Sequence, residues 1–300
     1  MGKLLRLKPV AVALLLGFLL TSCYKTPRDL FRGRGHKKKQ VSAASPPLKV
    51  ATREELYAII ARTYDGIESF QATNVNLTAS QGSLTTGITD YAAQPGIILF
   101  RRINGKDNIR VQAKARFVGT LLFDMVSDST NFRFLLPSKS TLFFGLNSAP
   151  ANSPSKMENL RPDAFLSSMF IRPFDPAIEV PMLKDDTNEE DALYRLELNR
   201  TSPDGTLVPG REVWFDREDL SIVKQKVYTP QGDIISDTDY SKWQMYNGVP
   251  FPAHIDINRR IDGYGVAIEI LEMVMNKEIA ADKFELPESE TEGATLKEIQ

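Results

Sequence analysis

The chain has 300 residues, and its 37 Lys and Arg residues nearly balance 38 Asp and Glu residues, which gives a formal net charge of −1. With one cysteine and two histidines, it can form no internal disulfide, and no pair of these residues is spaced to hold a zinc ion. The sequence also lacks a G-x-S-x-G nucleophile motif. We therefore predict a protein that is not an enzyme and that uses no metal or other cofactor.

Residues 1–22 predict a secretory signal peptide. Three basic residues, Lys3, Arg6 and Lys8, precede an apolar run from Val10 to Leu20. A membrane-spanning helix needs roughly 20 apolar residues, so this run is too short to cross a bilayer. A basic start followed by a short apolar run is typical of a segment that is removed on export, and it takes no part in the predicted fold.

The signal ends in Leu20-Thr21-Ser22-Cys23, which resembles a bacterial lipobox. The resemblance implies that Cys23 becomes the first residue of the mature chain and carries acyl chains, which would anchor the protein to a membrane. The alternative is an ordinary signal peptide followed by an unpaired thiol, which is a liability in an oxidising compartment. No aspartate follows Cys23, so by analogy with enteric bacteria we expect a lipoprotein of the outer membrane that faces the periplasm.

Residues 23–47 are rich in Lys, Arg, Ser, Gly and Pro, which predicts a disordered tether. Its positive charge could contact lipid phosphates or simply be solvated, and both interpretations stay open. Because the signal and the tether are basic, the chain after them is acidic, and we expect no nucleic-acid partner for such an exported protein. Against the single acid Asp29, the basic residues of the tether are Lys25, Arg28, Arg32, Arg34, Lys37, Lys38 and Lys39.

Residues 48–287 predict one large, mainly β domain, and residues 288–300 a polar C-terminal tail. Two stretches of the domain predict helices. Within residues 51–70, Thr52 and Glu55 form a capping box, apolar residues recur at helical spacing, and Gly66 marks the end. A shorter helix is expected within residues 160–170, where Pro162 suits a first helical position.

Most of the remaining domain alternates apolar and polar residues, which predicts antiparallel strands with one apolar and one solvated face. Turn signals separate the strands, and we count about ten or eleven of them. So many one-sided strands predict a barrel or a strongly curved sheet, with an interior that is either a packed core or an apolar cavity. The alternation is clearest in residues 108–114, 121–128, 131–137, 193–199, 254–260 and 266–271.

The order of these elements resembles the LolA/LolB-like outer-membrane lipoprotein-sorting proteins, whose fold is shared by the mycobacterial lipid carriers LppX and LprG. The resemblance covers nearly all of residues 50–287 and includes no invariant catalytic motif. It implies a half-open antiparallel β-barrel in which short helices form a lid or plug over an apolar cavity for acyl chains. It is carried by EELYAIIARTYDGIESFQATNVNLTAS, PGIILFRRINGKDNIRVQAK, GTLLFDMVSDSTNFRFLLPSKSTLFFG and REVWFDREDLSIVKQKVYTPQGDIISDTDYSKWQMYNGVPFPAHIDINRR.

The resemblance also implies a site and its ligand. The ligand would be the acyl chains of lipoproteins or lipids, with Phe165 and Met169 on the lid and a periplasmic carrier protein as a further partner. In this family an arginine ties the lid shut, and Arg101 and Arg102 are both candidates, although solvated strand-end arginines are the alternative. The expected cavity residues are Leu121, Phe123, Met125, Phe132, Phe134, Tyr194, Leu196, Ile255, Ile257, Ile268 and Ile270.

With its predicted lipid anchor, the chain resembles LolB, the anchored acceptor, more than LolA, the soluble shuttle. LolB proteins use one exposed apolar loop to push cargo into the bilayer, and the nearest candidate here is FIRPFDPAIEVPML, residues 170–183. We therefore expect transport or sorting of lipoproteins or lipids toward the outer membrane. The alternative is an envelope lipoprotein with a filled core that acts as a protein-binding, structural or sensory module.

Overall fold

The computed structural model describes residues 47–83, 87–103, 105–149 and 156–299. The predicted signal peptide, Cys23 and all of the tether before Pro47 lie outside these residues. Within them, fifteen strands form one mainly antiparallel sheet whose edge strands, β8 (Val180–Asp185) and β15 (Thr295–Ile299), do not pair with each other. The sheet is therefore open, which confirms the predicted half-open barrel, with more strands than the ten or eleven expected.

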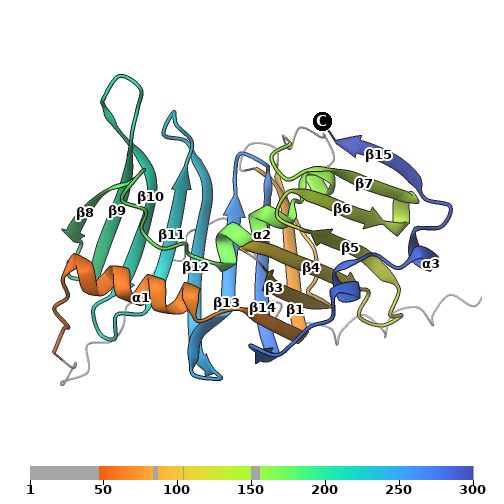
Figure 1. The fold of residues 1–300 in the computed structure, drawn as a ribbon, viewed down its shortest axis with the longest axis horizontal. Helices are drawn as coiled ribbons and strands as arrows, with labels where there is room; N and C mark the ends of the chain where they lie inside the picture. The colour runs from red at the N-terminus through yellow and green to blue at the C-terminus, as the bar shows by residue number, and fades with distance from the viewer. Residues whose placement is uncertain (1–46, 84–86, 104, 150–155, 300) are drawn as a thin grey trace, which may run out of the picture.

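The sheet has two halves that meet where β1 pairs with β14. Neighbouring strands follow the order β15-β7-β6-β5-β4-β3-β1-β14-β13-β12-β11-β10-β9-β8, and β2 pairs with β1 outside this path. Figure 1 shows β3 to β7 on one side of this junction and β8 to β13 on the other. The remaining strands are β1 (Ser69–Ser83), β2 (Gly87–Asp90), β3 (Gln94–Ile103), β4 (Lys106–Lys114), β5 (Leu121–Ser127), β6 (Asn131–Leu136), β7 (Thr141–Leu146), β9 (Leu193–Thr201), β10 (Leu207–Asp216), β11 (Ile222–Tyr228), β12 (Ile234–Tyr246), β13 (Val249–Arg259) and β14 (Tyr264–Met275).

Both predicted helices are present, as α1 (Arg53–Asp65) and α2 (Pro162–Met169), and a short α3 (Glu288–Thr291) follows near the C-terminus. The capping box of α1 is confirmed, because Glu55 N donates to Thr52 Oγ1 at 3.3 Å and Thr52 N donates to Glu55 Oε2 at 2.7 Å. The helix ends at Gly66, as expected. None of the helices in the described residues is long and apolar enough to cross a membrane.

One face of the sheet, here called the inner face, carries the main apolar core. Side chains of α1 and α2 pack on this face together with side chains from β1, β3 to β7 and β9 to β14. Figure 1 shows α1 running across the half that contains β9 to β13, with α2 between the two halves. The inner face thus has a continuous apolar lining that the two helices cover.

The opposite, outer face differs between the two halves. In the half with β3 to β7, residues 277–294, here called the C-terminal strap, cover it: Leu286 packs on Val126 and Leu135, and Phe284 packs on Leu99. In the other half the outer face carries cross-strand ion pairs. They include Lys184 with Glu197, Arg195 with Glu212, Lys224 with Asp237 and Lys242 with Glu269.

The strap changes the environment of side chains that the alternating pattern assigned to a solvated face. Asp124 has no exposed surface, and its Oδ1 and Oδ2 accept hydrogen bonds from Arg110 Nε at 3.0 Å and Nη2 at 2.5 Å. Gln112 Nε2 donates to the same carboxylate at 2.8 Å, while Arg110 Nη1 donates to the carbonyl of Lys283 in the strap at 3.1 Å. The solvated-face prediction is therefore wrong for Arg110, Gln112 and Asp124.

The C-terminus also differs from its prediction as a polar tail. Residues 288–299 contain α3 and β15, and β15 pairs in parallel with β7, from Thr295 opposite Thr141 to Ile299 opposite Gly145. Most residues of β15 are exposed, so the strand does not show the alternation of buried and solvated residues on which the strand prediction depends. The remaining domain boundaries stay predictions.

We predict that Asp124→Leu destabilises the protein by about 3–5 kcal/mol, because it leaves the charge of Arg110 buried without its partner. The double variant Arg110→Met/Asp124→Leu should recover most of that loss, since it removes both buried charges. Urea unfolding followed by circular dichroism measures both changes. A double variant as unstable as Asp124→Leu alone would contradict the ion pair as the cause.

Candidate functional site: the apolar interior and its lid

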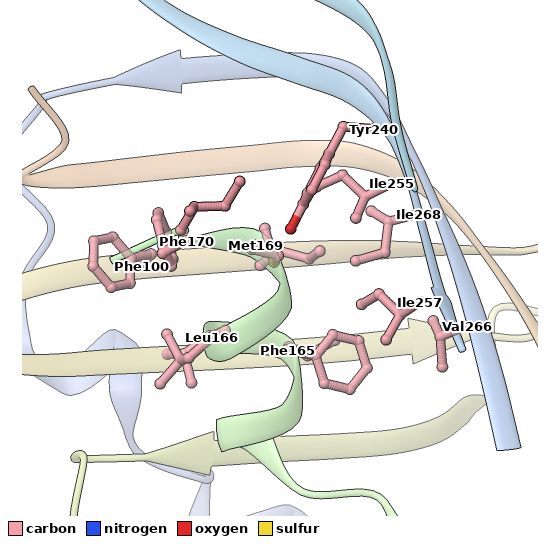
Figure 2. Close-up of a cluster of buried hydrophobic side chains, with 14 of the residues drawn as sticks. Phe100, Phe165, Leu166, Met169, Phe170, Tyr240, Ile255, Ile257, Val266 and Ile268 are labelled. Atoms are coloured by element: carbon pink, nitrogen blue, oxygen red, sulfur yellow. The ribbon is translucent and has the colours of Figure 1, made fainter. Parts of the chain in front are cut away.

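The predicted cavity residues come together on the inner face. With the exception of Leu121, all of them are buried members of the main apolar core, and the same core includes Phe165 and Met169 of α2. Figure 2 shows α2 inserted between Phe100 on one side and Ile255, Ile257, Val266 and Ile268 on the other. The sequence pattern therefore identified one contiguous apolar surface and the helix that lies on it; that these residues bind a ligand stays a prediction.

Leu121 lies elsewhere, because β5 contains an irregularity at its start. Ala113 pairs with Phe123, but the next residue of β4, Lys114, pairs with Leu121, so Leu122 is skipped. An extra residue of this kind reverses the alternation of side chains beyond it. Leu121 therefore packs with the outer cluster of Val126, Leu135 and Leu286 rather than in the interior.

The helix α2 fills the interior instead of bridging over an empty space. Its C-cap residue Phe170 lies 4.3 Å from Phe100 between ring centroids, and Phe70 and Phe251 complete the aromatic contacts around it. Between α1, α2 and strands β11 to β13 a cavity of about 10 Å³ remains, lined by Ile60, Met169 and other residues. That volume holds about one water molecule, whereas ligand pockets occupy roughly 300–1,000 Å³. An acyl chain could enter here only if α2 moved.

Polar contacts fasten α2 and the segment after it to the sheet. Tyr240 Oη donates to the carbonyl of Ser168 at 2.7 Å, and burial raises the pKa of this tyrosine, which keeps its hydroxyl a donor. After α2, Arg211 of β10 forms a buried pair with Glu179, with Nε to Oε1 at 2.7 Å and Nη2 to Oε2 at 2.9 Å. Arg211 also donates to the carbonyls of Arg172 at 2.5 Å and Pro173 at 2.8 Å.

We call residues 160–179 the lid segment, and Arg211 its clamp. Arg211 is not among the site residues predicted from the sequence, although the sequence contains a signal for it. On β10, Arg211, Val213 and Phe215 are spaced two residues apart, so their side chains lie on the same face. Val213 and Phe215 are both fully buried, which places Arg211 at an inward-facing position of an apolar strand. A buried arginine needs an anionic partner, and the adjacent Glu212 is on the opposite face of the strand, where it pairs with Arg195.

Arg101 and Arg102, the two predicted lid latches, hold other segments. Arg101 Nη1 donates to the carbonyl of Ile279 in the C-terminal strap at 2.6 Å, and its guanidinium lies over the ring of Phe284. Arg102 pairs with Asp107 at 2.8 Å and donates to the carbonyls of Tyr64 and Ile67 at the end of α1. The hydrogen bonds of both arginines thus fasten α1 and the strap, whereas Arg211 holds the lid segment.

The predicted apolar loop is exposed in its second half only. In residues 170–183, Phe170 and Ile171 are buried and Phe174 stacks on Tyr57 at 4.7 Å, whereas Ile178 is 60% exposed. The turn between β4 and β5 is a second exposed apolar segment, because Phe117 is 95% and Val118 75% exposed. We call these two residues the apolar tip.

The apolar tip has a well-defined backbone. Ala115 N donates to Thr120 O and Gly119 N to Ala115 O, both at 2.8 Å. Gly119 has a φ of 68°, which favours glycine at this position. Lys114 is exposed beside the turn, so a cation accompanies the two apolar side chains.

Few groups in the described residues offer other chemistry. No cluster of three or more His, Cys, Asp and Glu side chains there could hold a metal ion. His254 Nε2 lies 3.1 Å from Asp256 Oδ2 on β13, two residues away on the same strand. The absence of enzymatic activity stays a prediction.

Comparison with protein-family models and with curated proteins finds no match to the sequence. Solved structures do resemble the fold. A DUF1329-family protein from Desulfovibrio piger has a TM-score of 0.55 at 11% identity, over 77% of this chain and 96% of that one. A putative outer-membrane lipoprotein-sorting protein domain from Vibrio parahaemolyticus has a TM-score of 0.52 at 10% identity, over 78% of this chain and 97% of that one. A LolA-superfamily protein from Nitrosomonas europaea has a TM-score of 0.48 at 12% identity, over 79% and 99%.

Identities this low are informative about the fold alone. The matches cover most of each chain, so the likeness concerns the whole half-open barrel and not one hairpin. The chain therefore has the LolA/LolB-like fold that the sequence analysis predicted.

We predict that Arg211→Met frees the lid segment, because it removes every polar contact of the clamp and leaves Glu179 without its cation. Amide hydrogen exchange in residues 170–179 should become at least tenfold faster, and the stability should fall by about 3–5 kcal/mol. Lys242→Met is the matched control, since its pair with Glu269 is exposed and contributes about 0–1 kcal/mol. Equal exchange rates in both variants would show that Arg211 does not hold the lid.

Proposed function

We propose that this protein is a lipid-anchored protein of the bacterial envelope that binds acyl chains in its interior, for the transport or sorting of lipoproteins or lipids. The observation that carries the proposal is the seating of α2. A helix of eight residues occupies the apolar inner face of an open sheet, and it is held there by side-chain packing and a few polar contacts rather than by strand pairing. Such a plug can leave without breaking the sheet.

The energetics of an exchange between α2 and an acyl chain are close to balanced. Four apolar side chains of the lid segment, Phe165, Leu166, Met169 and Phe170, are buried in the interior. Burial of each contributes about 1.5–3 kcal/mol, so withdrawing all four costs roughly 6–12 kcal/mol. An acyl chain of about 16 carbons regains roughly 13 kcal/mol gross, at about 0.8 kcal/mol per methylene, before ordering costs are subtracted. A carrier needs this kind of near balance, because it must also release its ligand.

The envelope location and the anchor rest on the sequence. Cys23, the proposed lipidation site, lies outside the described residues, and the tether after it would let the acidic domain stand away from an anionic bilayer. The apolar tip of Phe117 and Val118 is suited to touch that bilayer when cargo is passed on. A soluble periplasmic carrier protein would then be the natural donor of the cargo, in line with the resemblance to a putative lipoprotein-sorting protein domain of Vibrio parahaemolyticus.

One observation favours a second function. Beside α2 the described side chains leave a cavity of only about 10 Å³. A domain with this fold and a permanently packed core would serve as a protein-binding, structural or sensory module of the envelope. The two functions differ in a single property, which is whether the lid segment ever leaves the inner face.

We predict that residues 48–300, produced in the periplasm without the anchor, co-purify with acyl lipids that mass spectrometry identifies. Ile268→Phe should reduce the bound lipid several-fold, because it adds volume to the inner face at a cost of about 1–3 kcal/mol. Leu135→Phe is the control, since it makes a similar change in the outer cluster and should leave the bound lipid unchanged. A folded wild-type domain that carries no lipid, even after Arg211→Met, would favour the filled-core function.

We also predict that the double variant Phe117→Ser/Val118→Ser slows transfer of a bound fluorescent fatty acid to phospholipid vesicles by on the order of tenfold or more, the effect of losing two apolar contacts with the membrane. Its stability should stay within about 0.5 kcal/mol of wild type, because both side chains are exposed. Leu207→Ser, at another exposed apolar position, is the control. Unchanged transfer in the double variant would exclude the apolar tip as a membrane contact.

A further inference from the structure

The apolar interior ends in a polar group of side chains on β13 and β14. Ile257 pairs with Val266 across these strands, and the next pair in the same register is Arg259 with Tyr264. Because residues two apart on a strand share a face, Arg259 and Tyr264 continue the inner-face rows of Ile257 and Val266. The interior lining therefore changes at this point from aliphatic side chains to a guanidinium and a phenol.

The lid segment brings a second arginine to the same end. Figure 2 shows Phe165 beside Ile257 and Val266, and Arg161 precedes Phe165 by four residues, which is one helical turn. Arg161 is 6% exposed, its Nη1 donates to the carbonyls of Glu158 at 2.6 Å and Leu160 at 2.9 Å, and its guanidinium lies over the ring of Phe132. Burial lowers its pKa from the ordinary value, with Tyr264 among the groups that oppose this shift.

The phenol of Tyr264 is the unusual member of the group. The residue is only 4% exposed, and its Oη has no hydrogen-bond partner among the described residues. A buried polar group without a partner costs about 1–3 kcal/mol, so such groups call for an explanation. Burial raises the pKa of Tyr264, with Arg259 and Arg161 both opposing the shift, so the hydroxyl stays protonated as a donor next to two cations.

Two carboxylates limit what the group can bind. Arg259 Nε is paired with Asp262 Oδ2 at 2.5 Å, and Asp163 stands exposed in the first turn of α2. A divalent cation is disfavoured by the two guanidinium groups and by the donor character of the phenol. One anionic group fits the unused donor of Tyr264, and the guanidinium groups of Arg161 and Arg259 supply positive charge beside it.

We propose that this end of the interior binds the anionic headgroup of an amphiphile, a carboxylate or a phosphate monoester, whose acyl chain takes the place of α2. The inference rests on the proposed function, and it narrows the ligand from acyl chains in general to single-chain anionic lipids. Arg161 precedes α2, and its guanidinium lies over the ring of Phe132 on β6. It can therefore stay beside Tyr264 when α2 withdraws, if the first two residues of the lid segment remain in place.

The test uses the full chain, purified with its anchor in a mild detergent, and three photoreactive probes with the same diazirine-bearing chain of 16 carbons. The probes end in a carboxylate, a phosphate and a neutral hydroxyl. Half-saturating probe concentrations are measured by crosslinking, and peptide mapping locates the crosslinks. We expect the wild type to bind at least one anionic probe about tenfold more tightly than the neutral one, the effect of one hydrogen bond to a charged group.

Tyr264→Phe should abolish that preference while leaving the neutral probe unaffected. Its thermal stability should equal or exceed that of wild type, since the change removes only an unpartnered oxygen. Tyr57→Phe is the matched control, because it also deletes a buried hydroxyl without a partner, but on α1 beside Phe174. Arg161→Gln should reduce the preference in the same direction as Tyr264→Phe.

The possible outcomes separate the two proposals. Preference for the carboxylate probe alone identifies a fatty acid, and preference for the phosphate probe alone identifies a lipid phosphate; either one supports the site if Tyr264→Phe abolishes it. Equal labelling of the interior by all three probes, unchanged in Tyr264→Phe, overturns the headgroup site and leaves acyl binding intact. Failure of every probe to label the interior, also in Arg211→Met, overturns acyl binding and the headgroup site with it.

Discussion

The pairing of β1 with β14 is the contact on which the rest of the molecule depends. It joins residues 69–83 to residues 264–275, and its register sets Val75 opposite Ile270 and Leu77 opposite Ile268. Without it the two halves would be separate sheets, each with half of an apolar face exposed. With it, the inner faces merge into one curved surface that α1 and α2 can cover from the same side.

That merged surface explains why the lid segment is placed where it is. A short helix between two halves of a sheet contacts both of them, so the eight residues of α2 bury most of their side chains although the helix is short. Its polar attachments lie at its end and beyond it, through Tyr240 and Arg211. Stability and a capacity to open are compatible in this arrangement, because packing and a few polar bonds can be exchanged for a ligand, whereas strand pairing cannot.

The inner face of the sheet could be predicted from the sequence, whereas the environment of the outer face could not. Apolar periodicity found the inner face, both helices and ten of the eleven residues assigned to the interior, since burial of one face imposes a period of two on every strand. It failed at Leu121, where an irregularity in β5 reverses the alternation. It also failed at Asp124 and Arg110, because a strap from the C-terminus covers a face that alternation assigns to solvent.

The sequence by itself determined the capped helix α1 and the apolar inner face, and its resemblance to the LolA/LolB-like proteins indicated the half-open form of the sheet. The first two features follow from local spacing and from composition, which act between residues close in the chain. Only the tertiary structure decided that α2 fills the interior, that Arg211 meets Glu179, and that Tyr264 lies buried near Arg161. Those contacts join residues far apart in sequence, and no local pattern records a partner that long-range strand pairing brings into place.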